Sequence, residues 1–241
     1  MSWLGRELSA FWQVLRDAPR LFWLAPLAVA LVMVPEFVQH VAEIRLGMFE
    51  SKAAFQAHAM DAARWYFGYA KLTGLPLAVL FCARFWANRE RGQRWWSFAG
   101  IAWKPLALGF LVQVVCSVPG MFGLDLPQQV SLAIGLVLTI ISLPGLVLIV
   151  AGLLGDRGLS LQDAYVRGWG KAVRILVYIG PVWFALQMLH EWDHHAALGS
   201  APALVWSLMV WDTAVVGMMA ALAGTGLHHG YIGPRINPQE G

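Results

Sequence analysis

The sequence has little charge and little cysteine. Only 13% of its 241 residues are charged, and it contains two cysteines. A soluble domain is about 25% charged, so this chain is no ordinary soluble enzyme. Both cysteines lie in apolar runs, which excludes a disulfide scaffold. Apolar side chains make up 59% of the chain, and its mean hydropathy is +0.59. This composition excludes a disordered chain and indicates a polytopic membrane protein.

Six apolar stretches are long enough for transmembrane helices, because a helical span needs about 20 mostly apolar residues. Alternation with a period of two is absent, and only helices or closed barrels satisfy their backbone in lipid. The sequence therefore predicts an all-α fold, a polytopic six-helix transmembrane bundle over residues 21–228. The expected spans are about 21–41, 65–86, 98–120, 129–153, 172–190 and 202–226.

Basic residues gather on one side of these spans. Segments 1–20, 84–104, 154–174 and 227–241 contain 13 of the 17 Lys and Arg residues. Because Lys and Arg are enriched in cytoplasmic segments, we expect a protein of the inner membrane with both termini in the cytoplasm and residues 229–241 as a cytoplasmic tail. The net charge of +3 then has a positional explanation, so no nucleic-acid partner is expected.

Two short segments have patterns typical of helices that lie in the membrane interface. In residues 1–20, apolar side chains recur at helical spacing opposite a charged face, until Pro19 stops the pattern. We expect an amphipathic interfacial helix there, with a partner-binding helix as the alternative. Ser160-Leu161-Gln162-Asp163 has the form of a capping box. It predicts a second, short interfacial helix before the fifth span.

Four of the ionisable residues inside the predicted spans are candidates for a functional or structural role, because a charge at the centre of a span costs on the order of +2.5 to +3.5 kcal/mol. Asp212 lies near the midplane, at a depth of roughly 15 Å for a rise of 1.5 Å per residue. Lys104, near the start of the third span, either extends outward to the interface or reaches inward toward Asp212. Glu36 and Lys71 lie at matching depths on adjacent spans. They predict a structural ion pair, with a polar cavity or ion path as the alternative.

His190-Glu191-Trp192-Asp193-His194 matches the zinc-binding pattern H-E-x-x-H. On a helix, imidazoles at positions i and i+4 share a face and bind zinc, while the glutamate acts as the general base. However, the motif lies at the end of the predicted fifth span, no third ligand is nearby in sequence, and Asp212 is expected far deeper. We therefore interpret the motif as a solvated outward turn. Metal binding by His190 and His194 is the alternative.

The order of several motifs resembles a known group of proteins. A basic stretch runs from Arg84 through Trp95-Trp96-Ser97, Leu143-Pro144-Gly145 lies in the fourth span, and the run from Gly155 to Ala164 follows it. This arrangement resembles the bacterial six-helix membrane proteins of the YciC-like group and the related membrane domain of some glycerophosphodiester phosphodiesterases. The resemblance implies an inner-membrane helical bundle associated with envelope or lipid processes. It transfers no functional residue.

The sequence contains no phosphate-binding loop, dinucleotide fingerprint, nucleophile elbow or paired C-x-x-C motif. The main hypothesis is therefore a non-enzymatic membrane protein without a cofactor. It would act as a scaffold, a complex subunit or a lipid-interacting envelope protein, in contact with the bilayer and with a membrane-protein partner or a second copy. One alternative is a small-solute or ion transporter that uses Asp212 with Lys104 and Glu36 with Lys71. The other is a zinc hydrolase at His190, Glu191 and His194.

Overall fold

The computed structural model describes residues 2–121 and 126–234, and all regular elements of these residues are helices. Six of the helices are long and apolar enough to cross a membrane. The prediction of an all-α polytopic fold is thus confirmed, and we treat the chain as a multi-pass membrane protein. The six helices are α3 (Pro26–Arg45), α5 (Ala62–Glu90), α6 (Trp103–Met121), α7 (Gln128–Leu154), α9 (Trp169–Ala197) and α10 (Pro202–Ile232).

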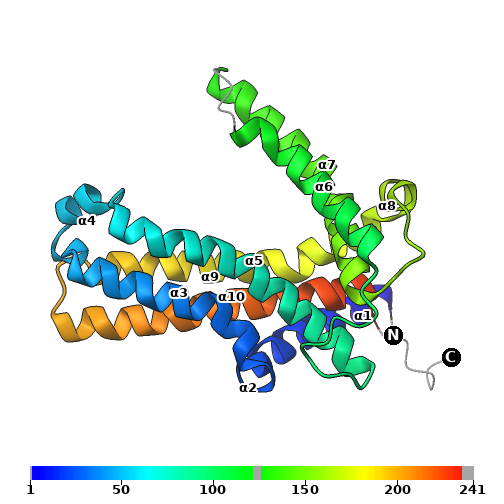
Figure 1. Cartoon of the computed structure of the whole chain (residues 1–241), viewed down its shortest axis with the longest axis horizontal. Helices are drawn as coiled ribbons and strands as arrows, with labels where there is room; N and C mark the ends of the chain where they lie inside the picture. Colours follow the sequence, from blue (N-terminus) through cyan, green and yellow to red (C-terminus); the bar gives the residue numbers. More distant parts are fainter. Residues whose placement is uncertain (1, 122–125, 235–241) are drawn as a thin grey trace.

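Four of these helices, α3, α5, α9 and α10, run side by side along the long axis of the molecule (Figure 1). Helix α10 is the central one, because it packs against each of the other three. Glycines allow this close approach. A Cβ atom added at Gly224 would lie 2.5 Å from the backbone oxygen of Val79, and one added at Gly230 would lie 2.9 Å from the Cα atom of Ile175. The backbone of α10 thus approaches α5 and α9 directly.

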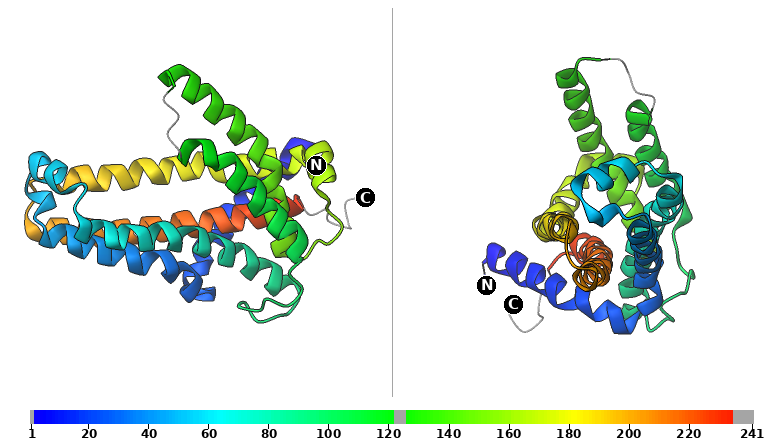
Figure 2. Two further views of the ribbon diagram at one scale, coloured as in Figure 1. Left: turned by 45° about the horizontal axis from the view of Figure 1, so that its top comes forward. Right: turned by 90° about the vertical axis from the view of Figure 1, so that its left-hand side faces the viewer.

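Helices α6 and α7 form a hairpin that leaves the four-helix bundle at an angle (Figures 1 and 2). The buried residues of α7 all lie between Pro144 and Leu154, so only its carboxyl-terminal part packs against the rest of the molecule. Within the hairpin, a Cβ atom at Gly109 would lie 2.6 Å from the backbone oxygen of Gly145. The base of the hairpin is therefore tightly packed, while its outer half is exposed.

Helix α1 (Trp3–Asp17) lies across one end of the bundle. The right-hand view of Figure 2 shows it lengthwise, where the bundle helices are seen nearly end-on. Ala10 and Val14 are buried against the bundle, whereas Trp3, Leu8 and Trp12 are each more than half exposed. The 3₁₀ turn η1 (Ala18–Arg20) and helix α2 (Leu21–Leu24) then lead into α3. An amphipathic helix that lies across the end of membrane spans has the geometry that an interfacial helix requires.

The end of the bundle next to α1, which we call the basic end, is held by arginine side chains. Arg84 of α5 donates to the backbone oxygens of Leu153 and Ala99, and also to that of Ser97 at 3.1 Å. Arg91 donates to the backbone oxygen of Leu154. The last carbonyl groups of a helix have no intrahelical donor. These two arginines therefore cap the carboxyl end of α7.

Helix α8 (Leu161–Arg167) precedes α9 at this end. The Oγ atom of Ser160 accepts the backbone N–H of Asp163 at 3.0 Å, as the capping box predicts. Helix α9 then runs to Ala197, so the helix continues past residue 190, where the apolar stretch of the expected fifth span ends. Helix α10 continues to Ile232, past the expected end of the bundle at residue 228. Residues 235–241 of the expected tail lie outside the described residues.

The opposite end, which we call the outer end, contains the turn between α9 and α10 and the connection between α3 and α5. That connection forms the 3₁₀ turn η2 (Met48–Glu50) and helix α4 (Lys52–His58). The Oγ atom of Ser51 caps α4 by accepting the backbone N–H of Ala54 at 3.1 Å. The backbone N–H of Gly199 donates to the carbonyl oxygen of Phe49 at 2.8 Å, which joins the two connections.

Candidate metal centre

The outer end of the bundle encloses a cluster of carboxylates and imidazoles from three helices, which we call the outer cluster. Helix α3 supplies three members at positions i, i+4 and i+7, which place them on one face of the helix. Helix α9 supplies three more and α10 supplies one. The members are Glu36, His40, Glu43, His190, Asp193, His194 and Asp212, and their four carboxylates are fully buried.

Asp212 lies at the centre of the outer cluster. Its Oδ1 atom is 2.7 Å from Nδ1 of His190, and its Oδ2 atom is 3.0 Å from Nε2 of His40. Nε2 of His194 is 3.6 Å from the same Oδ2 atom. Three imidazoles from two helices thus converge on one buried carboxylate from a third helix.

Two cations of α5 close the sides of the cluster. Nζ of Lys71 lies 2.8 Å from Oε2 of Glu36, so the predicted pair of these two residues is present. Nε of Arg64 donates to Oε1 of Glu43 at 2.8 Å. His40 links both pairs, because its ring nitrogens lie 3.2 Å from Glu36 and 3.0 Å from Glu43. The side chains of Lys71 and Arg64 are 21% and 20% exposed, so the cluster reaches the surface on the side of α5.

Four members of the cluster lie close enough together that they could hold a metal ion. One ligand atom from each of Glu36, His40, His194 and Asp212 lies within 4.8 Å of the others. Zinc binds four nitrogen, oxygen or sulfur ligands at about 2.0 to 2.3 Å, and a group this close contracts around an ion by small side-chain rotations. Imidazole nitrogens suit zinc and its first-row neighbours, whereas calcium and magnesium prefer oxygen ligands.

Asp193 is a further buried carboxylate on the same helix face as two of the imidazoles. Its side chain is fully buried, and neither carboxylate oxygen has a hydrogen-bond partner among the described residues. It shares a face of α9 with His190 and His194, because the three are separated by three and four positions. Burying an unpaired carboxylate is expensive, and a bound cation would remove that cost.

The charge balance of the cluster supports a divalent ion. Its four buried carboxylates are matched by two cations, Lys71 and Arg64. With neutral imidazoles, this leaves two negative charges without a counter-charge inside the cluster. Buried charges are retained in proteins when they are paired or coordinate metals, and one divalent cation would neutralise the cluster.

The structure corrects our interpretation of the H-E-x-x-H motif as a solvated turn. Because α9 continues to Ala197, the motif lies within the helix, and both of its imidazoles point toward Asp212. The expectation that Asp212 lies far deeper than the motif is therefore wrong, because Asp212 contacts both imidazoles of the motif. Glu191, the candidate general base, is exposed and accepts a hydrogen bond from Gln187 at 3.2 Å. It does not share the buried face of Asp193.

Lys104 does not belong to the cluster. It lies exposed in the first turn of α6, a helix that packs mainly against α7, whereas Asp212 is buried within the bundle. Of the two alternatives for Lys104, the one in which it reaches Asp212 is therefore wrong. Its exposure is what a lysine at the interface would have.

His40, Glu43 and Asp193 were missed by sequence reasoning. The signal for the first two was the spacing of Glu36, His40 and Glu43, which puts three polar groups on one helix face. Asp193 had no such signal, because its burial depends on α9 extending past residue 190.

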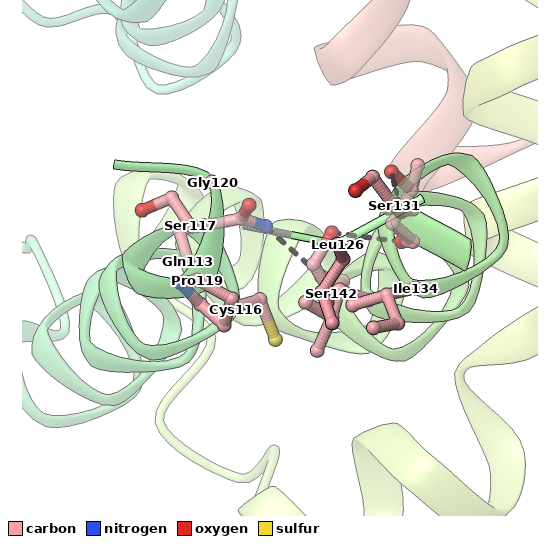
Figure 3. Close-up of a pocket in the computed structure, with 12 residues that line it drawn as sticks. Gln113, Cys116, Ser117, Pro119, Gly120, Leu126, Ser131, Ile134 and Ser142 are labelled. Atoms are coloured by element: carbon pink, nitrogen blue, oxygen red, sulfur yellow. Dashed lines mark hydrogen bonds between the residues drawn. The ribbon is translucent and has the colours of Figure 1, made fainter. Parts of the chain in front are cut away.

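A pocket of about 430 Å³ between α6 and α7 has no comparable chemistry (Figure 3). Its polar lining includes Gln113, Cys116 and Ser117, and Nε2 of Gln113 donates to the backbone oxygen of Ser142 at 2.9 Å. Cys116 is the one thiol or ionisable side chain among the residues that line this pocket. The pocket therefore offers no set of groups for acid–base or metal chemistry.

No family model matches the chain, and neither the curated proteins nor the solved structures contain a match to it. The resemblance to the YciC-like group thus stays a prediction. The outer cluster is the part of the described structure that carries the most chemistry.

Proposed function

We propose that this protein is a multi-pass inner-membrane protein that binds one divalent transition-metal ion of the zinc class at its outer cluster. The convergence of His40, His190 and His194 on buried Asp212 carries this proposal. Glu36, His40, His194 and Asp212 are the proposed ligands. His190 contacts both oxygens of Asp212 and is the positioning residue that orients this ligand.

The distribution of charge supports an orientation for the site. The basic end carries the Arg84 and Arg91 caps and the helix α1, and cytoplasmic segments are enriched in arginine and lysine. With both termini in the cytoplasm, the outer cluster faces the opposite side of the membrane. A metal ion would therefore enter from outside the cytoplasm.

The length of α10 supports access from that side. Its 31 residues are about 46 Å long, which exceeds a hydrocarbon core of about 30 Å. Part of the bundle therefore extends beyond the hydrocarbon. Asp212 is about 15 Å along α10 from Pro202 at the outer end, so we place the cluster near the outer boundary of the hydrocarbon rather than at its midplane.

Metal binding without hydrolysis is the form of this function that the geometry favours. A zinc hydrolase of the H-E-x-x-H type needs its glutamate beside the metal, and Glu191 instead lies on the exposed face of α9. Transport of the bound ion is the second candidate, because the buried carboxylates of the cluster lie on membrane-spanning helices. Uptake of zinc into proteoliposomes that depends on Asp212 would favour transport.

Metal content tests the proposal directly. The protein is purified in mild detergent without a histidine tag, incubated with zinc, desalted and analysed by mass spectrometry for metals. We expect one ion per chain, and loss of that ion in His40→Ala and Asp212→Asn. His195→Ala is the matched control, because His195 is exposed on the same helix next to His194. It should keep the metal, and so should Glu191→Gln.

Affinity separates ligands from the positioning residue. His190→Ala should weaken zinc binding by about 10- to 100-fold, as changes in outer-shell partners do, whereas His40→Ala should abolish it. Calcium and magnesium should not compete. A wild-type protein that binds no stoichiometric transition metal, or equal losses in His195→Ala and His40→Ala, would overturn the proposal.

A further inference from the structure

A second pocket, of about 610 Å³, lies at the basic end, far from the outer cluster. It is bordered by the end of α1, by η1 and α2, and by the last turns of α5 and α10. The lining residues that matter here are Asp17, Arg20, Trp23, Arg89, Glu90 and His229. None of them belongs to the outer cluster, so the pocket is independent of the proposed metal site.

The pocket presents charges of both signs. Arg20 and Arg89 line it together with the carboxylates of Asp17 and Glu90. Asp17 is held in place, because it accepts a hydrogen bond from Arg20 at 2.8 Å and lies 3.0 Å from Nε2 of His229. The side chain of Arg20 is still 56% exposed, so it remains accessible to a ligand. A ligand that matches this lining carries both an anionic and a cationic group.

One wall of the pocket is rigid. Trp86 of α5 is 7% exposed and donates from Nε1 to Oγ1 of Thr225 on α10 at 2.9 Å. Its ring meets that of His229 edge to face, with centroids 5.7 Å apart. His228, the residue before His229, is buried, and its Nε2 atom lies 3.5 Å from Oε2 of Glu90. The two helices therefore hold the carboxylate side of the pocket in a fixed position.

The surroundings of the pocket point to a lipid as its occupant. Trp23 is 67% exposed on the lining of the pocket, three residues before α3 begins at Pro26. Trp12 and Leu8 of α1 are also exposed. Tryptophan beside the start of a span marks the level of lipid headgroups, and an amphipathic helix with exposed apolar side chains lies in that layer. Lipid headgroups are therefore the charged molecules present at this level of the membrane.

We propose that this pocket binds the headgroup of a glycerophospholipid that carries a phosphate and a primary amine, as phosphatidylethanolamine does. Arg20 and Arg89 take the phosphate, for which the guanidinium fork is suited. The ammonium group faces Glu90. An anionic headgroup without an amine lacks this contact, so it binds more weakly.

Native mass spectrometry of the full chain in mild detergent tests this proposal. The probes are dioleoyl phosphatidylethanolamine, dioleoyl phosphatidylglycerol, dioleoyl phosphatidylcholine, and water-soluble O-phosphorylethanolamine and inorganic phosphate. We expect phosphatidylethanolamine to bind about tenfold more tightly than the other two lipids, which corresponds to the loss of one charge-assisted contact. The two soluble probes should bind far more weakly, because they lack the acyl chains.

Three variants assign the contacts. Arg89→Gln should weaken binding of phosphatidylethanolamine about tenfold, whereas Arg94→Gln, at an exposed arginine of the same end, should leave it unchanged. Glu90→Gln should remove the preference for phosphatidylethanolamine over phosphatidylglycerol while total lipid binding persists. That change in preference stays informative if Arg89→Gln folds poorly.

The opposite results overturn the proposal. Equal binding of phosphatidylethanolamine and phosphatidylglycerol by the wild type would remove the role of the amine. Equal binding of O-phosphorylethanolamine and the lipid would make the pocket a site for free phosphate compounds. Asp212→Asn, which disables the proposed metal site, should leave lipid binding unchanged, so the two proposals fail separately.

Discussion

The two ends of the bundle neutralise their charges in different ways. At the outer end, carboxylates meet imidazoles and two cations, as Asp212 meets His190 and His40. At the basic end, Arg84 and Arg91 donate to backbone carbonyls at the end of α7. An arginine that caps carbonyls keeps its charge at every physiological pH. Its guanidinium group has no acceptor atom for a metal ion. Imidazole–carboxylate contacts occur at both ends, but only at the outer end of the described structure do three imidazoles meet one buried carboxylate, so we place the metal chemistry there.

Loss of Asp212 should produce the largest effect. Asp212→Ala should lower the free energy of unfolding by about 3 kcal/mol, because it leaves buried imidazoles without their partner, and it should also abolish metal binding. The measurement is denaturation in mixed detergent micelles. Asp17→Ala is the comparison at the basic end, where one partner, Arg20, is 56% exposed and the other, His229, lies 3.0 Å away. It should cost about 1 kcal/mol. Equal losses would remove the contrast between the two ends.

Loss of Arg84 should come next. Arg84→Met should destabilise the protein by about 2 kcal/mol, because the backbone oxygens of Leu153, Ala99 and Ser97 lose a donor. Bound zinc should stay at the wild-type level. Arg94→Met, at an exposed position, is the control and should change neither quantity. If Arg84→Met lost its metal, the two ends would be coupled rather than separate.

The docking of α1 should depend on pH. Burial raises the pKa of Glu7, but hydrogen bonds from Arg174 at 3.0 Å and from Tyr178 at 2.6 Å outweigh burial, so its pKa lies below the ordinary value of 4.5. A carboxylate with a lowered pKa contributes stability above its unfolded pKa and loses it as the pH falls through the folded value. Wild type should therefore lose more thermal stability between pH 5 and pH 3 than Glu7→Gln does.

The matched control for this pH effect is Glu191→Gln at the outer end, where the carboxylate is exposed. It should keep the pH dependence of the wild type. If Glu7→Gln kept it as well, the contact of Glu7 with Arg174 and Tyr178 would not contribute to stability in solution.

Loss of the α8 cap should have the smallest effect. Ser160→Ala removes the acceptor of the Asp163 backbone N–H and should cost about 1 kcal/mol locally. Hydrogen exchange should become faster within Leu161–Arg167 and stay unchanged in α10. Ser207→Ala, at an exposed position within α10, should change the exchange rate in neither Leu161–Arg167 nor α10. Faster exchange in α10 after the Ser160 change would contradict a purely local role.

Features that depend on local sequence were predictable. The six spans follow from runs of apolar residues, and the cap at Ser160 follows from its spacing to Asp163. The pair of Glu36 and Lys71 was predicted because equal depth on adjacent spans brings two residues together, and it forms at 2.8 Å. In each case the partners lie on one helix or on two successive spans.

The outer cluster was not predictable in the same way. Its centre requires Asp212 to meet His190, and their depths could be compared only once the outer end of α9 was known. Hydropathy ended this span at residue 190, whereas the helix continues through polar residues to Ala197. Hydropathy locates the apolar part of a helix but not its polar extension. Because the predicted end of this span preceded the true end of the helix, the motif was expected outside the bundle.

The α6–α7 hairpin is inclined to the bundle, so its apolar surface extends less far along the bundle axis than the apolar surface of the four-helix bundle does. Its outer ends stop short of the α9–α10 turn along the bundle axis (Figure 1), and its outer half exposes Leu132, Leu136 and Val137. Lipid beside the hairpin therefore contacts a shorter hydrophobic surface than lipid beside the bundle. A bilayer adapts to such a mismatch by changing its thickness, at a fraction of a kcal/mol per Å. The molecule should thin the bilayer on its hairpin side and partition into the thinner of two coexisting membrane phases.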